Sequence, residues 1–445
     1  MAGIAGMIGA GRREDVERML HAIQHRGRTG HRVLEIGGAA MGAVWPNCQP
    51  DSAQADDGAV QDRDAGGRLA LARVLDGGLT LRRDWIGVAP LYYGRTQTGD
   101  LCFASEVKAM LKVASEVHEL PPGCELKDGK VESYWTLGEL QPVDGTPGPI
   151  AADLRQRLVE SVRRCTGSDC VGAWLSGGLD SSTMAALARP NVRTLHTFAG
   201  GLADSPDIDH AREAAQFIGS EHHEVIVTFE QMLKVLPDVI FHLESFDALL
   251  VRSSIVNYLV GKAASDHVDE VFSGEGGDEL FAGYDYLRSL PLDRLHGELL
   301  DITGRLHNTA LQRVDRCACS HGLVAHVPFL DPEVFHCALR IPVAYKGVNG
   351  VEKWILRQAM AGALPDRVLN RRKAKFWEGS GVGAGLADHA EQRVSDADFA
   401  RERQLPNGWR INTKEELMYY RIFQEHFGQL TDLSWMGRTK GAPVT

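Results

Sequence analysis

The sequence feature that most constrains this 445-residue chain is the run Trp-Leu-Ser-Gly-Gly-Leu-Asp-Ser-Ser at 174–182. The apolar segment 170–175 before it is typical of a buried strand, and a helix is expected to begin near Ser181. Between them, Gly177 and Gly178 let backbone N–H groups approach an anion, and a helix N-terminus favours negative charge. The run therefore predicts a phosphate-binding loop; the simpler interpretation is a serine-rich turn that only caps the helix.

One residue of this loop carries a charge of its own. Asp180 would repel a phosphate unless a cation lay between them, which implies Mg²⁺ bridging carboxylate and phosphate oxygens. The loop does not match GxxxxGK[ST], so it is not a Walker-type NTPase loop.

Strand-like and helix-like segments alternate around this loop. A helix is expected at 151–165, and further apolar runs occur at 192–199, 224–228 and 268–272. Such alternation predicts an α/β domain in which helices cover both faces of a parallel sheet. From about residue 284 onward the chain is expected to be mostly helical.

The first 140 residues have a different pattern. Short apolar segments separated by Gly, Asp and Asn predict strands at 1–8, 69–75, 79–81, 91–93 and 101–104. Helices are expected at 13–24 and 105–113, and the polar stretch 47–67 is expected to be a loop. A Pro/Gly-rich break at 141–150 separates this part from the rest, which predicts two domains, 1–140 and 146–445.

Composition excludes several classes of protein. Lys and Arg number 48 against 59 Asp and Glu, a formal net charge of −11, which argues against a nucleic-acid partner. No apolar stretch reaches the ~18 residues of a membrane span, and no signal-peptide layout is present. The eight cysteines form no CxxC pair, which favours reduced thiols and a cytoplasmic protein.

Several motifs besides the loop occur in a fixed order along the chain. They are GIAG at 3–6, HRG at 25–27, DWIGVAPLYY at 84–93, FASE at 103–106, ESFD at 244–247, RSS at 252–254, SGEGGDELFAGY at 273–284, HVPFLD at 326–331, KWILR at 353–357 and RRK at 371–373. Together with the SGGxDS loop, they resemble the asparagine synthetase family over nearly the whole chain. The resemblance implies an N-terminal Ntn-hydrolase-like αββα sandwich and a C-terminal ATP-pyrophosphatase (adenine nucleotide α-hydrolase-like) parallel-sheet domain with a helical C-terminal part.

The resemblance also implies roles for individual residues. The expected pyrophosphate-binding residues are Ser176, Gly177, Gly178, Asp180, Ser181 and Ser182. Those expected to line the adenosine pocket are Leu175, Gly200, Ser273 and Gly274, and those expected to ligate Mg²⁺ are Asp180 and Asp278.

Four further residues are matched to the chemistry. Lys373 would stabilise charge at the α-phosphate, unless it belongs to a solvated basic run. Glu275 would remove a proton from the incoming amine, with a structural carboxylate near Mg²⁺ as the alternative. Arg252 would pair with the non-reacting substrate carboxylate, with a salt bridge at the edge of the core as the alternative, and Arg313 is a further substrate-binding candidate.

The N-terminal part departs from the family at the nucleophile. Glutamine-dependent members carry a cysteine after the initiating methionine, whereas this chain has Ala2 and no Cys, Ser or Thr in its first twenty residues. The family's Asn-Gly-Glu segment is also missing between residues 38 and 82. An engineered change would account for Ala2 alone. The domain is therefore interpreted as a degenerate glutaminase domain that does not hydrolyse glutamine.

Two other features bear on the substrates. The segment 373–381 resembles a Lys…Glu-Gly-Ser-Gly segment of β-lactam synthetases, yet those enzymes have tyrosine where this chain has Glu275. Ala310 replaces an aspartate usual in asparagine synthetases, which argues against free aspartate as the acid. The two adjacent histidines at 222–223 are expected to lie at the edge of a strand and not to form a metal site.

The expected activity is an ATP- and Mg²⁺-dependent, AMP-forming amide ligase. It would adenylate a small carboxylic acid and transfer the acyl group to ammonia or a small-molecule amine. The alternatives are intramolecular ring closure of the β-lactam-synthetase or peptide-macrocycle type, and a non-catalytic nucleotide-binding scaffold. The sequence leaves the acid, the amine and the oligomeric state open, a homodimer included.

Overall fold

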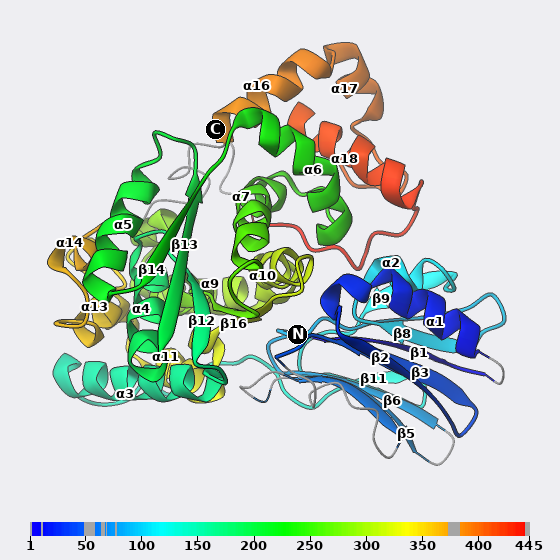
Figure 1. The fold of residues 1–445 in the computed structure, drawn as a ribbon, viewed down its shortest axis with the longest axis horizontal. Coiled ribbons are helices and arrows are strands. Elements are labelled where there is room, and N and C mark those ends of the chain that lie inside the picture. Colours follow the sequence, from blue (N-terminus) through cyan, green and yellow to red (C-terminus); the bar gives the residue numbers. More distant parts are fainter. Residues whose placement is uncertain are drawn as a thin grey trace.

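The computed structural model describes residues 2–9, 12–48, 58–63, 67, 69–75, 78–372 and 383–440. The N-terminal part contains two antiparallel sheets, with strand orders β2-β3-β1-β8-β7-β9 and β11-β10-β6-β5-β4 (Figure 1). The strands are β1 (Gly3–Ile8), β2 (Gly30–Ile36), β3 (Ala39–Trp45), β4 (Ala59–Arg63), β5 (Leu69–Leu75), β6 (Gly78–Arg83), β7 (Tyr92–Arg95), β8 (Leu101–Ala104), β9 (Glu116–Glu119), β10 (Cys124–Lys127) and β11 (Lys130–Ser133). Helices α1 (Arg13–Ala22) and α2 (Val107–Met110) lie on the outer face of the six-stranded sheet (Figure 1).

The second domain is built on a parallel sheet with the strand order β14-β13-β12-β15-β16. Its strands are β12 (Cys170–Trp174), β13 (Thr194–Gly201), β14 (Glu221–Ile226), β15 (Glu270–Phe272) and β16 (Val324–His326). The helices of this part are α3 (Pro147–Cys165), α4 (Leu179–Ala188), α5 (Pro206–Ile218), α6 (Phe229–Leu243), α7 (Ala248–Ala264), α8 (Gly277–Phe281) and α10 (Ala310–Cys319). Helices α4 and α5 pack on one face of the sheet and α7 and α10 on the other (Figure 1). The predicted α/β fold, with a two-sheet N-terminal domain and a parallel-sheet domain, is confirmed.

The remaining described elements are almost all helical, as the sequence predicts. They are α9 (Leu292–Gly304), α11 (Pro332–Arg340), α12 (Val343–Lys346), β17 (Gly347–Val348), β18 (Val351–Glu352), α13 (Trp354–Ala359), α14 (Asp366–Leu369), α16 (Gly383–Arg393), α17 (Asp396–Glu402) and α18 (Lys414–Phe427). Short 3₁₀ turns lie at Gln24–Arg26, Arg189–Asn191, Asp285–Ser289, Leu306–Asn308 and Pro328–Leu330. Among the described residues, no helix combines the length and the apolar composition that crossing a membrane requires.

Local sequence signals account for where the principal helices begin. Thr228 and Gln231 form a capping box at the start of α6, each side chain accepting the other's backbone N–H at 3.2 and 2.8 Å. The Asp247 side chain caps α7 by accepting the Leu250 N–H at 2.9 Å.

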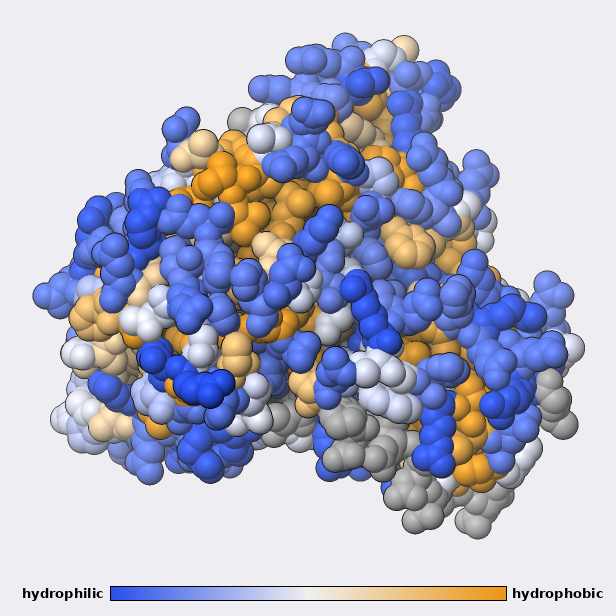
Figure 2. All heavy atoms as spheres, viewed as in Figure 1, coloured by the Kyte–Doolittle hydropathy of each residue, from blue (hydrophilic) through white to orange (hydrophobic). Residues whose placement is uncertain are grey.

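Apolar side chains gather on the molecular surface around α6 (Figure 2).

Two sequence-based predictions of local structure are wrong. The expected loop at 47–67 contains the strand Ala59–Arg63, which pairs antiparallel with β5. The polar residues of this strand resemble those of a loop. One of them, Asp62, is nevertheless fully buried, and it accepts a hydrogen bond of 2.9 Å from the backbone N–H of Ala2. The linker expected at 141–150 ends early, because α3 begins at Pro147. Proline suits the first position of a helix, where its missing N–H costs no helical hydrogen bond.

Buried charges join the two domains. Arg26, 1% exposed, donates two hydrogen bonds of 2.8 Å to Asp315 on α10 and a third to Glu106. Arg316, also 1% exposed, pairs with Glu106 at 2.9 Å and with Glu244 at 3.2 Å. Burial alone would raise the pKa of Asp315, but the charge and hydrogen bonds of Arg26 outweigh burial and lower that pKa. The contact between the domains therefore depends on complete charge pairing.

Replacing Asp315 by Asn tests this contact. Arg26 would keep its charge and lose its bidentate partner inside the protein, so we expect Asp315→Asn to lower the free energy of unfolding by about 3 kcal/mol at pH 7. Urea unfolding would measure it. The control is Glu333→Gln, which breaks the exposed pair with Arg157 and should change the stability little. Equal effects of the two substitutions would contradict the assigned importance of the buried pair.

Candidate active site

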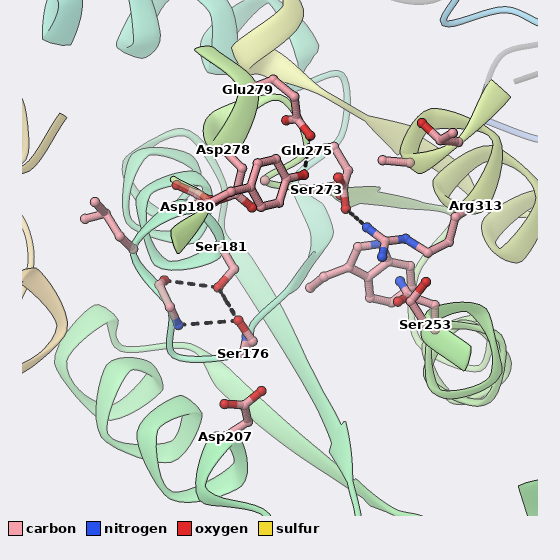
Figure 3. A pocket seen from close by; sticks show the side chains of 18 of the residues that line it. Ser176, Asp180, Ser181, Asp207, Ser253, Ser273, Glu275, Asp278, Glu279 and Arg313 are labelled. Atoms are coloured by element: carbon pink, nitrogen blue, oxygen red, sulfur yellow. Dashed lines mark hydrogen bonds and ion pairs between the residues drawn. The ribbon is translucent and has the colours of Figure 1, made fainter. Parts of the chain in front are cut away.

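The predicted phosphate loop connects β12 to α4. Gly177 has φ +66°, and a Cβ there would lie 2.3 Å from the backbone carbon of His210, so this position requires glycine. The Ser176 and Ser181 hydroxyls lie 3.1 Å apart, and the Ser181 hydroxyl donates to the Gly178 carbonyl at 3.2 Å (Figure 3). The loop thus presents hydroxyls and the first N–H groups of α4 to the same space.

A cavity of about 560 Å³ opens above this loop. The predicted site residues that line it are Leu175, Ser176, Gly178, Asp180, Ser181, Gly200, Ser273, Gly274, Glu275, Asp278 and Arg313. The structure therefore brings most of the predicted site together from three strand ends and α10. Ser182 does not line the cavity; it is fully buried in α4, and its hydroxyl has no hydrogen-bond partner among the described residues.

Asp180 and Asp278 converge on one cation. The Lys353 ammonium forms ion pairs with both carboxylates, although the two aspartates lie in the first turns of different helices, α4 and α8. Two glycines make room for the cluster: a Cβ on Gly277 would lie 2.6 Å from the Asp180 carboxyl carbon, and one on Gly283 would lie 2.1 Å from Asp278 Oδ1. Because both carboxylates reach a single position, their oxygens fit Mg²⁺, which prefers one or two carboxylates plus phosphate oxygens.

Lys353 is a site residue that the sequence reasoning did not single out. It belongs to the KWILR motif, and that motif and the charge of the lysine were the signals available. It adopts φ +54°, a strained conformation for a residue other than glycine, immediately before α13. This conformation accompanies the placement of its ammonium between the two aspartates, which lie 173 and 75 residues away along the chain.

A second group of charges lies beside the first. Arg313 pairs with Glu275, and Tyr284 donates its hydroxyl hydrogen to Glu279 (Figure 3). Burial, together with the negative charges of Asp278 and Glu275, raises the pKa of Glu279 to about 7. Glu279 and Tyr284 also line the cavity and were not among the predicted site residues, although the SGEGGDELFAGY motif contains both. The surroundings of Glu279 therefore disfavour the ionised form of its carboxyl group.

The opposite wall of the cavity is apolar. Phe198, Gly200 and Val260 line it, and a Cβ on Gly200 would lie 2.3 Å from Val260, so α7 packs directly against β13 there. At the rim, Arg371 donates to the Ser176 carbonyl at 2.8 Å and pairs with Asp207. Lys373 lies outside the described residues.

Arg252 lies outside the lining of the cavity. Its guanidinium pairs with Glu415 of α18, whose other contact is the Tyr419 hydroxyl at 2.7 Å. This geometry corresponds to the salt bridge at the edge of the core, which was the alternative to substrate binding.

Residue 2, where the sequence predicts a lost glutaminase nucleophile, is fully buried. Ala2 donates its N–H to Asp62 and accepts a 2.9 Å hydrogen bond from Arg26 Nε. Burial raises the pKa of Asp62 to about 6, although the positive charge of Arg26 opposes that rise. The backbone of residue 2 is therefore held between an acid and a guanidinium, and its methyl side chain cannot attack an amide.

Two known protein families match parts of the chain. The asparagine synthase profile matches residues 153–301 and 291–441, and the glutamine amidotransferase domain profile matches residues 68–125. The chain is 35% identical over 371 residues to the glutamine-hydrolysing asparagine synthetase B of Escherichia coli (strain K12), covering 78% of this chain and 67% of that protein. The chain belongs to the asparagine synthase family.

Further relatives show how much of the chain is similar to asparagine synthetases. Identity to a glutamine-hydrolysing asparagine synthetase 2 of Arabidopsis thaliana is 34% over 373 residues, covering 78% of this chain and 64% of that protein. The chain thus spans about two thirds of the length of these asparagine synthetases. Among solved structures, NMN synthetase from Francisella tularensis aligns with a TM-score of 0.30 and 13% identity, covering 64% of this chain and 98% of that one.

The phosphate loop gives a first prediction for the site. Gly177→Ala would force a side chain against the His210 backbone at a positive φ, so we expect the affinity for ATP to fall at least about tenfold. Binding of a fluorescent ATP analogue would measure this. Gly167→Ala is the control, because a Cβ at Gly167 meets nothing within 4 Å. Unchanged ATP affinity in Gly177→Ala would contradict the assigned loop.

Glu279 gives a second prediction, in the pH dependence of stability. Because folding raises the pKa of Glu279 from its ordinary 4.5 to about 7, the native state binds more protons than the unfolded state between these values. Its contribution is fully present below pH 4.5 and is lost as pH rises through 7. Glu279→Gln cannot ionise, so we expect its stability relative to wild type to increase by on the order of 3 kcal/mol from pH 4.5 to pH 8.

Unfolding in urea at several pH values would measure this difference. Glu425→Gln, an exposed change on α18, is the control and should follow wild type at every pH. A constant difference between Glu279→Gln and wild type across the range would contradict the raised pKa.

Proposed function

We propose that this protein is an ATP-dependent, AMP-forming amide ligase that activates a small carboxylic acid as its acyl-adenylate and releases pyrophosphate. The amine that accepts the acyl group is ammonia or a small molecule, and glutamine is not hydrolysed. The observation that carries the proposal is the convergence of Asp180 and Asp278 beside the glycine loop, where a metal-bound triphosphate would lie.

The chemistry follows from the poor reactivity of a carboxylate. Attack of an amine on a carboxylate would have to expel oxide, whereas an acyl-adenylate expels AMP. The acid's oxygen attacks the α-phosphorus of ATP, the bond to pyrophosphate breaks, and the loop serines and N–H groups hold the departing pyrophosphate. When bound, Mg²⁺ would neutralise charge on the phosphate oxygens.

Within this proposal, Asp180 and Asp278 hold Mg²⁺, and Lys353 moves from between them toward a phosphate oxygen. Its ammonium already lies between the two carboxylates, so a small displacement suffices. Lys373 is proposed as a second cation, at the α-phosphate and later at the tetrahedral adduct.

The second half-reaction needs a neutral amine. We assign Glu275 as the base that removes the amine's proton. Arg313 holds the carboxylate of Glu275 in place until the substrate enters. Because Ala310 offers no carboxylate beside Arg313 in the cavity, an acid other than free aspartate is proposed. The substrates are small molecules rather than nucleic acid or membrane, and the reaction is placed in the cytoplasm.

Pyrophosphate release in the presence of ATP, Mg²⁺ and a panel of carboxylic acids tests the function. Release that depends on an acid and on ammonium or an amine supports the ligase. Acid-dependent release without added amine would favour intramolecular ring closure, and ATP binding without release across the panel would favour a nucleotide-binding scaffold. Transfer of ¹⁸O from the acid into AMP identifies adenylation, and glutamate released from glutamine would contradict the assigned loss of glutaminase activity.

The paired aspartates give a specific prediction. Asp278→Asn keeps the shape of the side chain and removes the charge that would hold the metal, so we expect pyrophosphate release to fall at least about 100-fold. Asp293→Asn, on the exposed start of α9, is the matched control and should leave the rate unchanged. Wild-type rates in Asp278→Asn at limiting Mg²⁺ would contradict its role.

A further inference from the structure

Three histidines meet on the face of the parallel sheet that α7 covers. His196 lies on β13, His223 lies on the edge strand β14, and His267 lies in the turn between α7 and β15. One ring nitrogen of each lies within 4.8 Å of those of the other two. The His196 Nδ1 and His223 Nε2 atoms already form a hydrogen bond of 3.0 Å. The sequence shows only the pair at 222–223, because the two other histidines of the group lie 27 and 44 residues from His223.

The spacing of the three ring nitrogens suits metal binding. Neutral imidazole nitrogens bind Zn²⁺ at about 2.0–2.1 Å, which places tetrahedral ligands about 3.4 Å apart. The His196 and His223 nitrogens are 3.0 Å apart, and no two of the three ligand nitrogens are more than 4.8 Å apart, so the expected spacing lies within this range. Small side-chain rotations would therefore bring all three nitrogens onto one ion.

A carboxylate stands next to the three rings. Glu221 lies two residues before His223, so both side chains are on the same face of β14. Its Oε2 atom is 3.7 Å from His196 Nδ1, and its side chain is 67% exposed and able to rotate. We propose that His196, His223 and His267, with Glu221 as fourth ligand, form a zinc-class metal site that fastens the edge strand β14 to the turn after α7.

This site is separate from the aspartate pair of the cavity. His196 lies four residues before Gly200 on β13, a separation of about 13 Å along a strand. Three nitrogens and one oxygen favour Zn²⁺ over Mg²⁺, whereas the two aspartates offer only oxygen. Four protein ligands leave no open position, which is typical of a structural site rather than a catalytic one.

Metal binding to the full-length protein, purified without a histidine tag and freed of metal by chelation, tests the proposal. Zn²⁺ binding would be measured by calorimetry, and Co²⁺ would be used as a spectroscopic probe, because its visible absorption reports tetrahedral geometry. We expect one Zn²⁺ per chain, tetrahedral Co²⁺ absorption that Zn²⁺ abolishes, and a melting temperature that rises on adding Zn²⁺.

The variants are His223→Gln and His267→Gln, the second being in an exposed turn where folding is least at risk. Each should weaken Zn²⁺ binding at least about 100-fold and abolish the Co²⁺ signal and the Zn²⁺-dependent rise in melting temperature. The matched control is His118→Gln on the edge strand β9, where Glu116 precedes the histidine by two residues but no other histidine ring is in contact among the described residues. It should bind Zn²⁺ as wild type does.

Either of two results would overturn the site. One is a wild-type protein that takes up no Zn²⁺ at micromolar concentration. The other is Zn²⁺ or tetrahedral Co²⁺ binding that persists unchanged in both His223→Gln and His267→Gln, since the ion would then be held by other residues.

Discussion

Two like charges must share one place in this protein, and much of the second domain is arranged to allow it. Asp180 follows β12 and Asp278 follows β15, and neighbouring parallel strands bring these loops together. Lys353 offsets the repulsion, and Gly277 and Gly283 leave space for the three side chains. A cluster assembled in this way keeps two carboxylates at a single position, with the lysine balancing their charge.

The N-terminal domain uses buried charge differently. Arg26 binds Asp315 across the domain boundary and Glu106 within its own domain, and its guanidinium also donates to the Ala2 carbonyl. Charges removed from water in this way are stable only when every partner is present. The residues around position 2 therefore contribute to the contact between the two domains.

Local patterns made the phosphate loop predictable, because its strand, glycines and helix start are contiguous in the sequence. The parallel sheet was predictable for the same reason, since each strand and helix carries its own periodicity. Lys353 was not, because its position between two aspartates arises only when β12, β15 and the segment before α13 pack together. The strand Ala59–Arg63 was missed because its buried Asp62 is polar in sequence and is satisfied by a residue 60 positions away. The histidine group was hidden by the same separation, and Arg252 could not be assigned without seeing Glu415.

The hydrogen bonds at Ala2 are made by its backbone. Its N–H donates to Asp62, and its carbonyl accepts from Arg26, which also binds Asp315 of the opposite domain. The main chain at residue 2 therefore helps to hold the two halves of the molecule together without any contribution from its side chain.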